Sequence, residues 1–92
     1  MRGERTRMYL GNVAGNVRRL RLQQQLTQQA LAEAADLDLS FVQRVERAAE
    51  NPSVDSLVRM ADALGVSPGV LFHKATKPPI KRGRPPKRRQ ER

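Results

Sequence analysis

The chain has 92 residues, which suits one small domain with a single core and leaves no room for a second. It has no cysteine, which excludes disulfides and Cys-ligated zinc, no apolar run near the roughly 18 residues of a membrane span, and no signal-peptide pattern, so we expect a cytoplasmic protein. Its formal net charge of +9 favours a polyanionic partner.

The first quarter of the chain predicts an arm followed by a helix. Residues 1–10 hold three arginines and little apolar material, so we expect a loose basic N-terminal arm whose end, Met8-Tyr9-Leu10, docks on the fold. From about Gly11 the pattern predicts an amphipathic helix that ends near Gln24. Its apolar positions recur at helical spacing: Val13, Val17 and Leu20.

Two short helices joined by a tight turn are expected next. Thr27 is a suitable N-cap for a helix that ends near Ala35. Asp36 stands at the turn, where it tolerates left-handed backbone better than most residues but less well than glycine. Asp38 is the expected N-cap of the following helix. The side of that helix opposite Val42 and Val45 is polar and carries Ser40, Gln43, Arg44 and Arg47.

Two more helices complete the expected domain. Ser53 is the expected N-cap of a helix that ends at Gly65, and Ser67-Pro68 predicts the start of a short fifth helix. We therefore predict an all-α fold with five helices in residues 11–74. Residues 75–92 hold too much proline and charge to pack, so we expect a disordered basic tail.

Residues spread from Val17 to Phe72 together form one recognisable pattern. They are Arg21, Leu26-Thr27-Gln28, Leu31-Ala32, Leu37, Ser40-Phe41-Val42, Val45-Glu46-Arg47, Asn51-Pro52-Ser53, Leu57, Ala61, Leu64-Gly65-Val66 and Leu71-Phe72. The pattern resembles the Cro/C1-type (XRE-like) helix-turn-helix family, which includes phage repressors, restriction-modification controller proteins and bacterial antitoxins. The resemblance implies a lambda-repressor-like domain that places its third helix in the major groove of double-stranded DNA, as a homodimer on a palindromic site.

The resemblance also implies which side chains meet DNA. Four residues would face base edges: Leu39, Ser40, Gln43 and Arg44. Three more would meet phosphates: Gln28, Arg47 and Asn51. The side-chain chemistry agrees, because glutamine can read adenine bidentately, arginine can read guanine or hold a phosphate, and helix N-termini attract phosphate.

Further positions bear on the geometry of this helix pair. The resemblance implies that Arg21 and Glu46 pair beneath the third helix and fix its tilt. The chain departs from the family pattern at Gln25, Asp36 and Ala48, where the family often has glycine. Each departure raises the cost of left-handed backbone by about 1 kcal/mol, so we expect the fold to survive, with helix ends that shift by a residue or two.

Most of the positive charge lies in the tail. Residues 77–92 hold eight Lys or Arg and one acid, whereas residues 1–76 hold ten Lys or Arg and eight acids. Within the tail, Arg82, Gly83, Arg84 and Pro85 resemble the core of an AT-hook. Glycine lets the backbone approach the floor of the minor groove, and A·T-rich sequence narrows that groove around arginine. The alternative is a generic basic extension that adds only phosphate contacts.

Together these features predict a sequence-specific DNA-binding transcriptional regulator, located in the cytoplasm and associated with the nucleoid. Two alternatives stay open: an architectural nucleoid DNA-binding protein dominated by its tail, and an antitoxin-like protein-interaction module. We expect neither an enzyme nor a cofactor, metal, membrane partner or small-molecule ligand. No nucleophile or acid/base pair is evident, and His73 is the only histidine.

Overall fold

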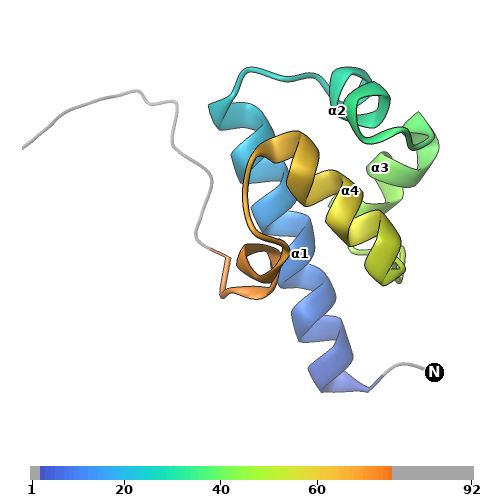
Figure 1. Cartoon of the computed structure of the whole chain (residues 1–92). Coiled ribbons are helices and arrows are strands. Elements are labelled where there is room, and N and C mark those ends of the chain that lie inside the picture. The colour runs from blue at the N-terminus through green and yellow to red at the C-terminus, as the bar shows by residue number, and fades with distance from the viewer. Residues whose placement is uncertain (1–2, 76–92) are drawn as a thin grey trace, which may run out of the picture.

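Figure 1 shows a long helix with four shorter elements packed around it. This computed structural model describes residues 3–75. Its elements are α1 (Glu4–Gln23), α2 (Gln28–Ala35), α3 (Leu39–Glu46), α4 (Val54–Leu64) and the 3-10 helix η1 (Pro68–Phe72). No strand occurs in residues 3–75, so the predicted all-α class is confirmed. None of these helices is long and apolar enough to cross a membrane.

The fifth predicted helix is a 3-10 helix, so the fold has four α-helices rather than five. Pro68 and Gly69 occupy its first positions, and it ends after five residues. Its backbone bonds run from Val70 N to Ser67 O at 3.0 Å and from His73 N to Val70 O at 3.2 Å. Bonds between residues three positions apart define a 3-10 helix, a form that is common in pieces as short as this one.

The predicted start of the first helix near Gly11 is wrong, because α1 begins at Glu4. The expected loose arm is therefore helical over residues 4–10. Glu4 in the first turn complements the positive end of the helix dipole. Tertiary contacts also stabilise these first turns of α1. Leu10 is buried, and the Tyr9 ring meets the Phe72 ring edge-on with 6.1 Å between centroids. Met8 stays exposed, so only part of the expected docking segment docks.

Local capping chemistry places the next helices where the sequence predicted them. Thr27 Oγ1 accepts a hydrogen bond from Ala30 N at 2.9 Å, and Ser53 Oγ accepts one from Ser56 N at 3.0 Å. Asp38 occupies the N-cap position of α3, but its side chain makes no capping bond. The Thr27 and Ser53 bonds satisfy backbone donors that the first turn of a helix leaves unpaired.

The three positions that depart from the family's glycines all adopt left-handed backbone. The φ angles are 59° at Gln25, 57° at Asp36 and 58° at Ala48. The fold forms despite the free-energy cost of these left-handed conformations, and α2 still ends at Ala35 as predicted. The expected shift of the helix ends is therefore absent at the turn between α2 and α3.

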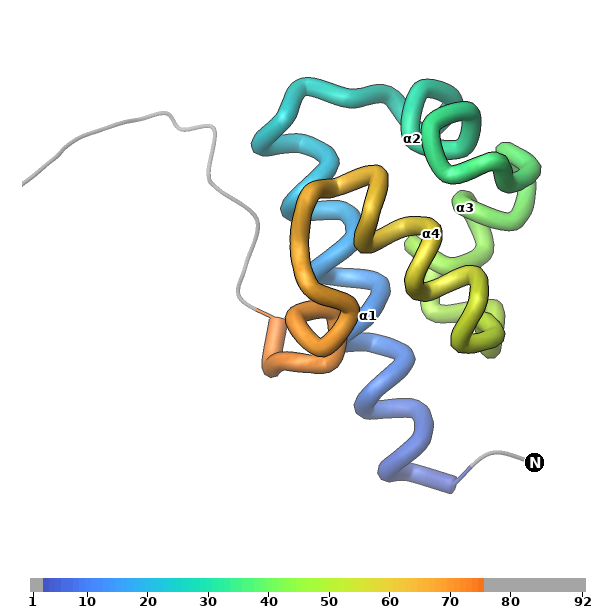
Figure 2. The backbone as a smooth tube through the Cα atoms, in the orientation of Figure 1, coloured from blue at the N-terminus to red at the C-terminus, as the bar shows by residue number. Residues whose placement is uncertain are grey.

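The core lies between α1 and the other elements, and Asn16 joins it to the C-terminal segment. This fully buried amide donates to Val70 O at 3.3 Å, Leu71 O at 3.0 Å and His73 O at 2.8 Å. These bonds hold η1 against α1, and the tube in Figure 2 shows the two segments side by side. Met60 is fully buried in this core.

Candidate nucleic-acid interface

The turn between α2 and α3 presents one side of α3 to solvent. Leu37 N donates to Ala32 O at 2.9 Å, which closes α2 as the chain turns at Asp36. Val42 and Val45 then face the core with 0% and 1% exposure. The predicted base-facing residues differ in how far they emerge: Ser40 is exposed, Gln43 and Arg44 are half-buried, and Leu39 is half-buried and packs against the core.

An ion pair between Arg21 and Glu46 lies beneath α3. Arg21 Nε donates to Glu46 Oε2 at 2.7 Å, and Nη2 donates to Oε1 at 3.0 Å. Arg21 Nη1 also donates to Leu26 O at 2.9 Å. The two side chains are only 11% and 5% exposed, so this contact is a buried bidentate pair and not a loose surface contact. It joins α1 to the last turn of α3.

Gln28 is drawn into the same cluster. Its Nε2 donates to Glu46 Oε1 at 3.0 Å, so the side chain expected to meet a phosphate is partly engaged inside the protein. A primary amide carries two N–H donors, and this bond uses one of them. Glu46 therefore ties the start of α2, as well as α1, to α3.

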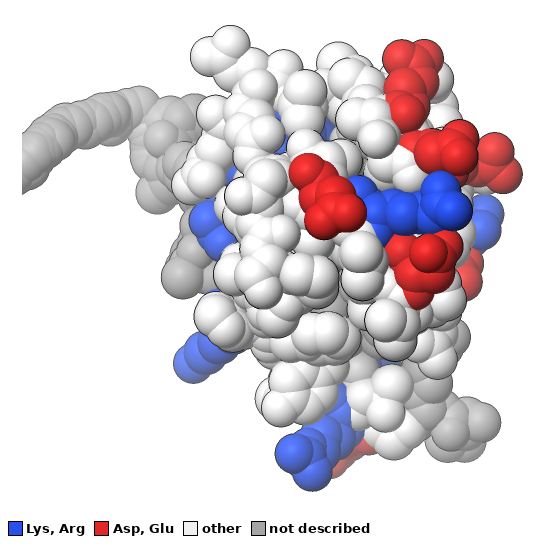
Figure 3. All heavy atoms as spheres, in the orientation of Figure 1, with Lys and Arg blue, Asp and Glu red and all other residues white. Residues whose placement is uncertain are grey.

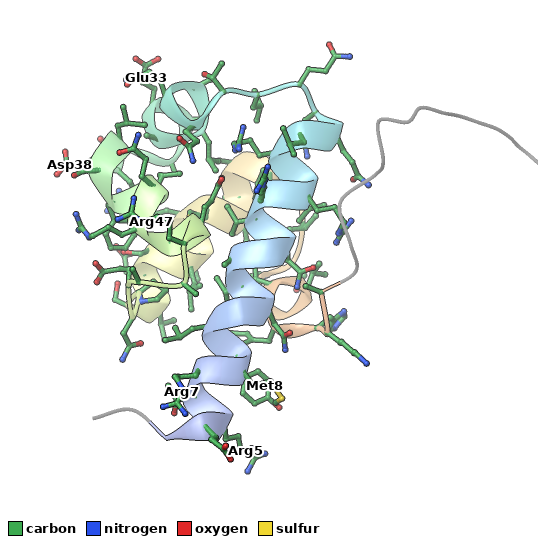
Figure 4. The ribbon with its side chains drawn as sticks, turned by 180° about the vertical axis from the view of Figure 1, so that it is seen from behind. Arg5, Arg7, Met8, Glu33, Asp38 and Arg47 are labelled. Carbon is green, nitrogen blue, oxygen red and sulfur yellow. The ribbon has the colours of Figure 1, made fainter. Side chains whose placement is uncertain are left out.

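An open hollow of about 480 Å³ lies beside this cluster. Its lining consists of Arg18, Arg21, Thr27, Gln28, Glu46 and Arg47. Arg18 and Arg47 are exposed at this hollow, and Figure 4, seen from behind the view of Figure 1, shows Arg47 at the end of α3. Arg21 and Glu46 neutralise each other, so the two exposed arginines and the Gln28 amide leave a hollow suited to a phosphate. The sequence did not indicate Arg18, because only the packing of α1 against α3 brings it near Arg47.

Arg44 has a partner that sequence reasoning missed. Its Nε donates to Glu50 Oε1 at 2.8 Å, and its guanidinium carbon lies 5.8 Å from the centroid of the Phe41 ring. The Arg44 and Glu50 side chains are 42% and 27% exposed. The left-handed residue Ala48 and the bond from Ala49 N to Arg44 O at 2.8 Å turn the chain back, which brings Glu50 beside α3.

Asn51, the third expected phosphate contact, is exposed but lies on a different hollow. That hollow measures about 310 Å³ and is lined mainly by apolar groups, with Tyr9, Leu57 and Phe72 among them. The structure thus brings Gln28 and Arg47 together and leaves Asn51 apart from them. The predicted tail residues, Arg82, Gly83, Arg84 and Pro85, lie outside residues 3–75.

The opposite face of the domain is acidic. Figure 3 shows acidic side chains gathered around one basic side chain over α2 and α4. Arg59 donates from Nε to Asp55 Oδ2 at 2.7 Å and lies 3.3 Å from Asp36 Oδ2. The hydrogen bond and charge of Asp55, followed by the charge of Asp36, raise the pKa of Arg59 above its ordinary value. A polyanion would be disfavoured on this face, whereas Arg18 and Arg47 lie on the other.

Comparison with known proteins agrees with this geometry. A helix-turn-helix family model matches residues 17–71, so the chain belongs to the XRE-type helix-turn-helix family, a family of DNA-binding transcriptional regulators. The helix-turn-helix resemblance inferred from the sequence is confirmed. The chain is similar to the immunity repressor protein of Bacillus phage phi105, with 34% identity over 64 residues. The match covers 70% of this chain but only 44% of the repressor.

Two solved structures are similar over most of their own length. The restriction-modification controller protein C.AhdI from Aeromonas hydrophila has 36% identity and a TM-score of 0.66, over 68% of this chain and 96% of the controller. A variant of the controller protein C.Esp1396I, bound to its highest-affinity operator site, has 32% identity and a TM-score of 0.64. That match covers 71% of this chain and 86% of the controller.

Proposed function

We propose that this protein is a sequence-specific transcriptional regulator that binds a palindromic operator as a homodimer, with α3 in the major groove. The observation that carries the proposal is the buried Arg21–Glu46 pair. This pair fixes α3 against α1, while the polar side of α3 faces solvent. A reading helix needs this rigidity, because base contacts tolerate little misplacement.

The exposed side of α3 supplies the base contacts in this proposal. Ser40 and Gln43 offer hydrogen bonds to base edges, and Gln43 has the donor and acceptor that adenine requires. Leu39 contributes only its solvent-facing part, against a thymine methyl group, because the rest of it packs on the core. Arg44 completes the base-facing set.

Phosphate contacts would hold α3 in register. We assign them to Arg18 and Arg47 together with the second amide hydrogen of Gln28, because these groups line one hollow. Asn51 would meet a separate phosphate beyond the end of α3. Contacts of this kind orient the protein and make binding salt-dependent, but they do not read sequence.

The tail would bind DNA next to the operator. Arg82 and Arg84 would enter an A·T-rich minor groove, with Gly83 allowing close approach and Pro85 keeping the backbone extended. Because the tail is tethered to the domain, its contact is effectively intramolecular once α3 is bound. The tail and the domain together should therefore bind more tightly than either part alone.

Selection of binding sites from random DNA by the full chain tests this function. The expected product is a palindrome flanked by A·T-rich sequence, and light scattering of the complex should show two chains per duplex. An A·T-rich product without a palindrome would favour the architectural alternative. Failure to enrich any DNA, with an acidic protein that co-purifies tightly, would favour the protein-interaction alternative.

A further inference from the structure

We propose that Glu50 determines specificity by holding Arg44 as a reader of guanine instead of a contact to phosphate. This inference rests on the proposed placement of α3 in the major groove. Glu50 would act as a positioning residue, because it touches Arg44 and makes no base contact of its own.

Two neighbours hold the guanidinium of Arg44: the Glu50 carboxylate at Nε and the Phe41 ring beside its central carbon. Glu50 Oε1 accepts from Nε at 2.8 Å, and the Phe41 ring lies 5.8 Å from the guanidinium carbon. Within residues 3–75, Nη1 and Nη2 of Arg44 make no hydrogen bond or ion pair. The two terminal nitrogens therefore remain available as a pair of donors while Nε is held by Glu50.

Such a pair of donors suits guanine. Bidentate reading uses two parallel N–H groups directed at O6 and N7, and a guanidinium held beforehand loses less conformational freedom on binding. The pair is also accessible, since the Arg44 side chain is 42% exposed. Arg44 can thus meet a base edge without first leaving Glu50.

The same contact makes Arg44 a poor phosphate ligand. The carboxylate cancels most of the positive charge at this point, so long-range attraction to the DNA backbone is lost while the hydrogen-bond donors remain. Arg47 lies three residues further along the chain, is exposed, and has no ion pair within the described part of the protein. The two arginines therefore take different roles, because only Arg44 is paired with Glu50.

The end of α3 brings Glu50 to this contact: Ala48 N donates to Val45 O at 3.0 Å and Ala49 N donates to Arg44 O at 2.8 Å, which closes the helix. Ala48 adopts a left-handed conformation with φ 58°, which an alanine does not favour, and this turn returns the chain to Arg44. A half-exposed ion pair adds little to stability, so the Glu50 contact is not needed to keep the domain folded. For the same reason, substitution of Glu50 should leave the domain folded.

The test compares E50Q with E33Q, which removes the same charge from the exposed surface of α2. Each full-length variant is titrated by fluorescence anisotropy against the selected operator and against operators with one base pair replaced at a time. For E50Q we expect stronger binding to unrelated DNA and an approximately tenfold loss of discrimination at one G·C pair per half-site. E33Q should keep the wild-type discrimination at every position.

R44K provides the second arm, because lysine keeps the charge but loses the bidentate donors. It should lose preference at the same G·C pair that E50Q relaxes. Unchanged discrimination by E50Q, or preference lost by R44K at a different pair, would overturn the role of Glu50 while a palindromic wild-type site still supports the proposed function. If the wild-type protein selects no site, the proposed function fails and this inference fails with it.

Discussion

Glu46→Ala removes a carboxylate that accepts three hydrogen bonds, two from Arg21 and one from Gln28. The remaining guanidinium belongs to a residue that is 9% exposed, and it keeps only the carbonyl oxygen of Leu26 as a partner. Breaking a buried ion pair from one side costs about 3–5 kcal/mol. Total stability for a domain of roughly 70 residues is about 4–10 kcal/mol, so we expect this variant to be close to unfolding.

Urea denaturation followed by circular dichroism measures this loss, and a double-mutant cycle with Arg21→Ala isolates the pair. We expect a coupling free energy of about 1–3 kcal/mol between the two positions. Asp55→Ala is the matched control, because the Asp55–Arg59 pair is 73% and 43% exposed and should contribute much less to stability than the buried pair. A coupling below about 0.5 kcal/mol, or equal costs for Glu46→Ala and Asp55→Ala, would refute the structural role of the buried pair.

Four further predictions follow from other parts of the molecule. Ala48→Gly should raise the free energy of unfolding by about 1 kcal/mol, because glycine accepts the left-handed backbone; destabilisation in urea would contradict this. Gly15→Ala should destabilise the domain by about 1–3 kcal/mol, since its Cβ would lie 2.7 Å from the Cβ of Ala75, three residues after η1. Gly11→Ala, with nothing within 4 Å, should stabilise α1 by about 0.5–1 kcal/mol; equal thermal shifts for the two would count against the close approach. Truncation after Lys74 should weaken DNA binding and flatten its salt dependence without changing the preferred core sequence, as measured by anisotropy at several salt concentrations; an unchanged slope would exclude a DNA contact by the tail. Gln43→Ala should relax preference at one base pair by about 1–3 kcal/mol, and uniform weakening on all sequences would remove it from the base-reading set.

Local chemistry explains what the sequence predicted well. Thr27 and Ser53 cap their helices through bonds to residues three positions away, which a pattern can reveal. The Arg21–Glu46 contact spans a longer interval, and it was expected only because the chain resembles a family. The left-handed backbone at Asp36 was expected on two grounds. The chain had to turn there, and the family often has glycine at this position.

Packing explains what the sequence did not predict. Residues 4–10 lack a local apolar stripe, and their helix depends on contact between Tyr9 and the distant Phe72. The approach of Arg18 to Arg47 depends on how α1 crosses α3. Likewise, the helical pattern of α3 could not indicate Glu50, because a left-handed residue beyond the helix end brings it back.

Two carboxylates near the end of α3 illustrate how burial separates their effects on binding. Glu46 is 5% exposed and shared between Arg21 and Gln28, so its charge fixes position and is hidden from DNA. Glu50 is 27% exposed and holds one edge of Arg44, so its charge remains effective at the surface. Removing Glu46 should therefore weaken binding through loss of the folded domain, whereas removing Glu50 should strengthen binding to unrelated DNA and reduce selectivity. Both substitutions remove one negative charge. Opposite changes in the affinity for unrelated DNA would therefore separate the structural effect of Glu46 from the electrostatic effect of Glu50.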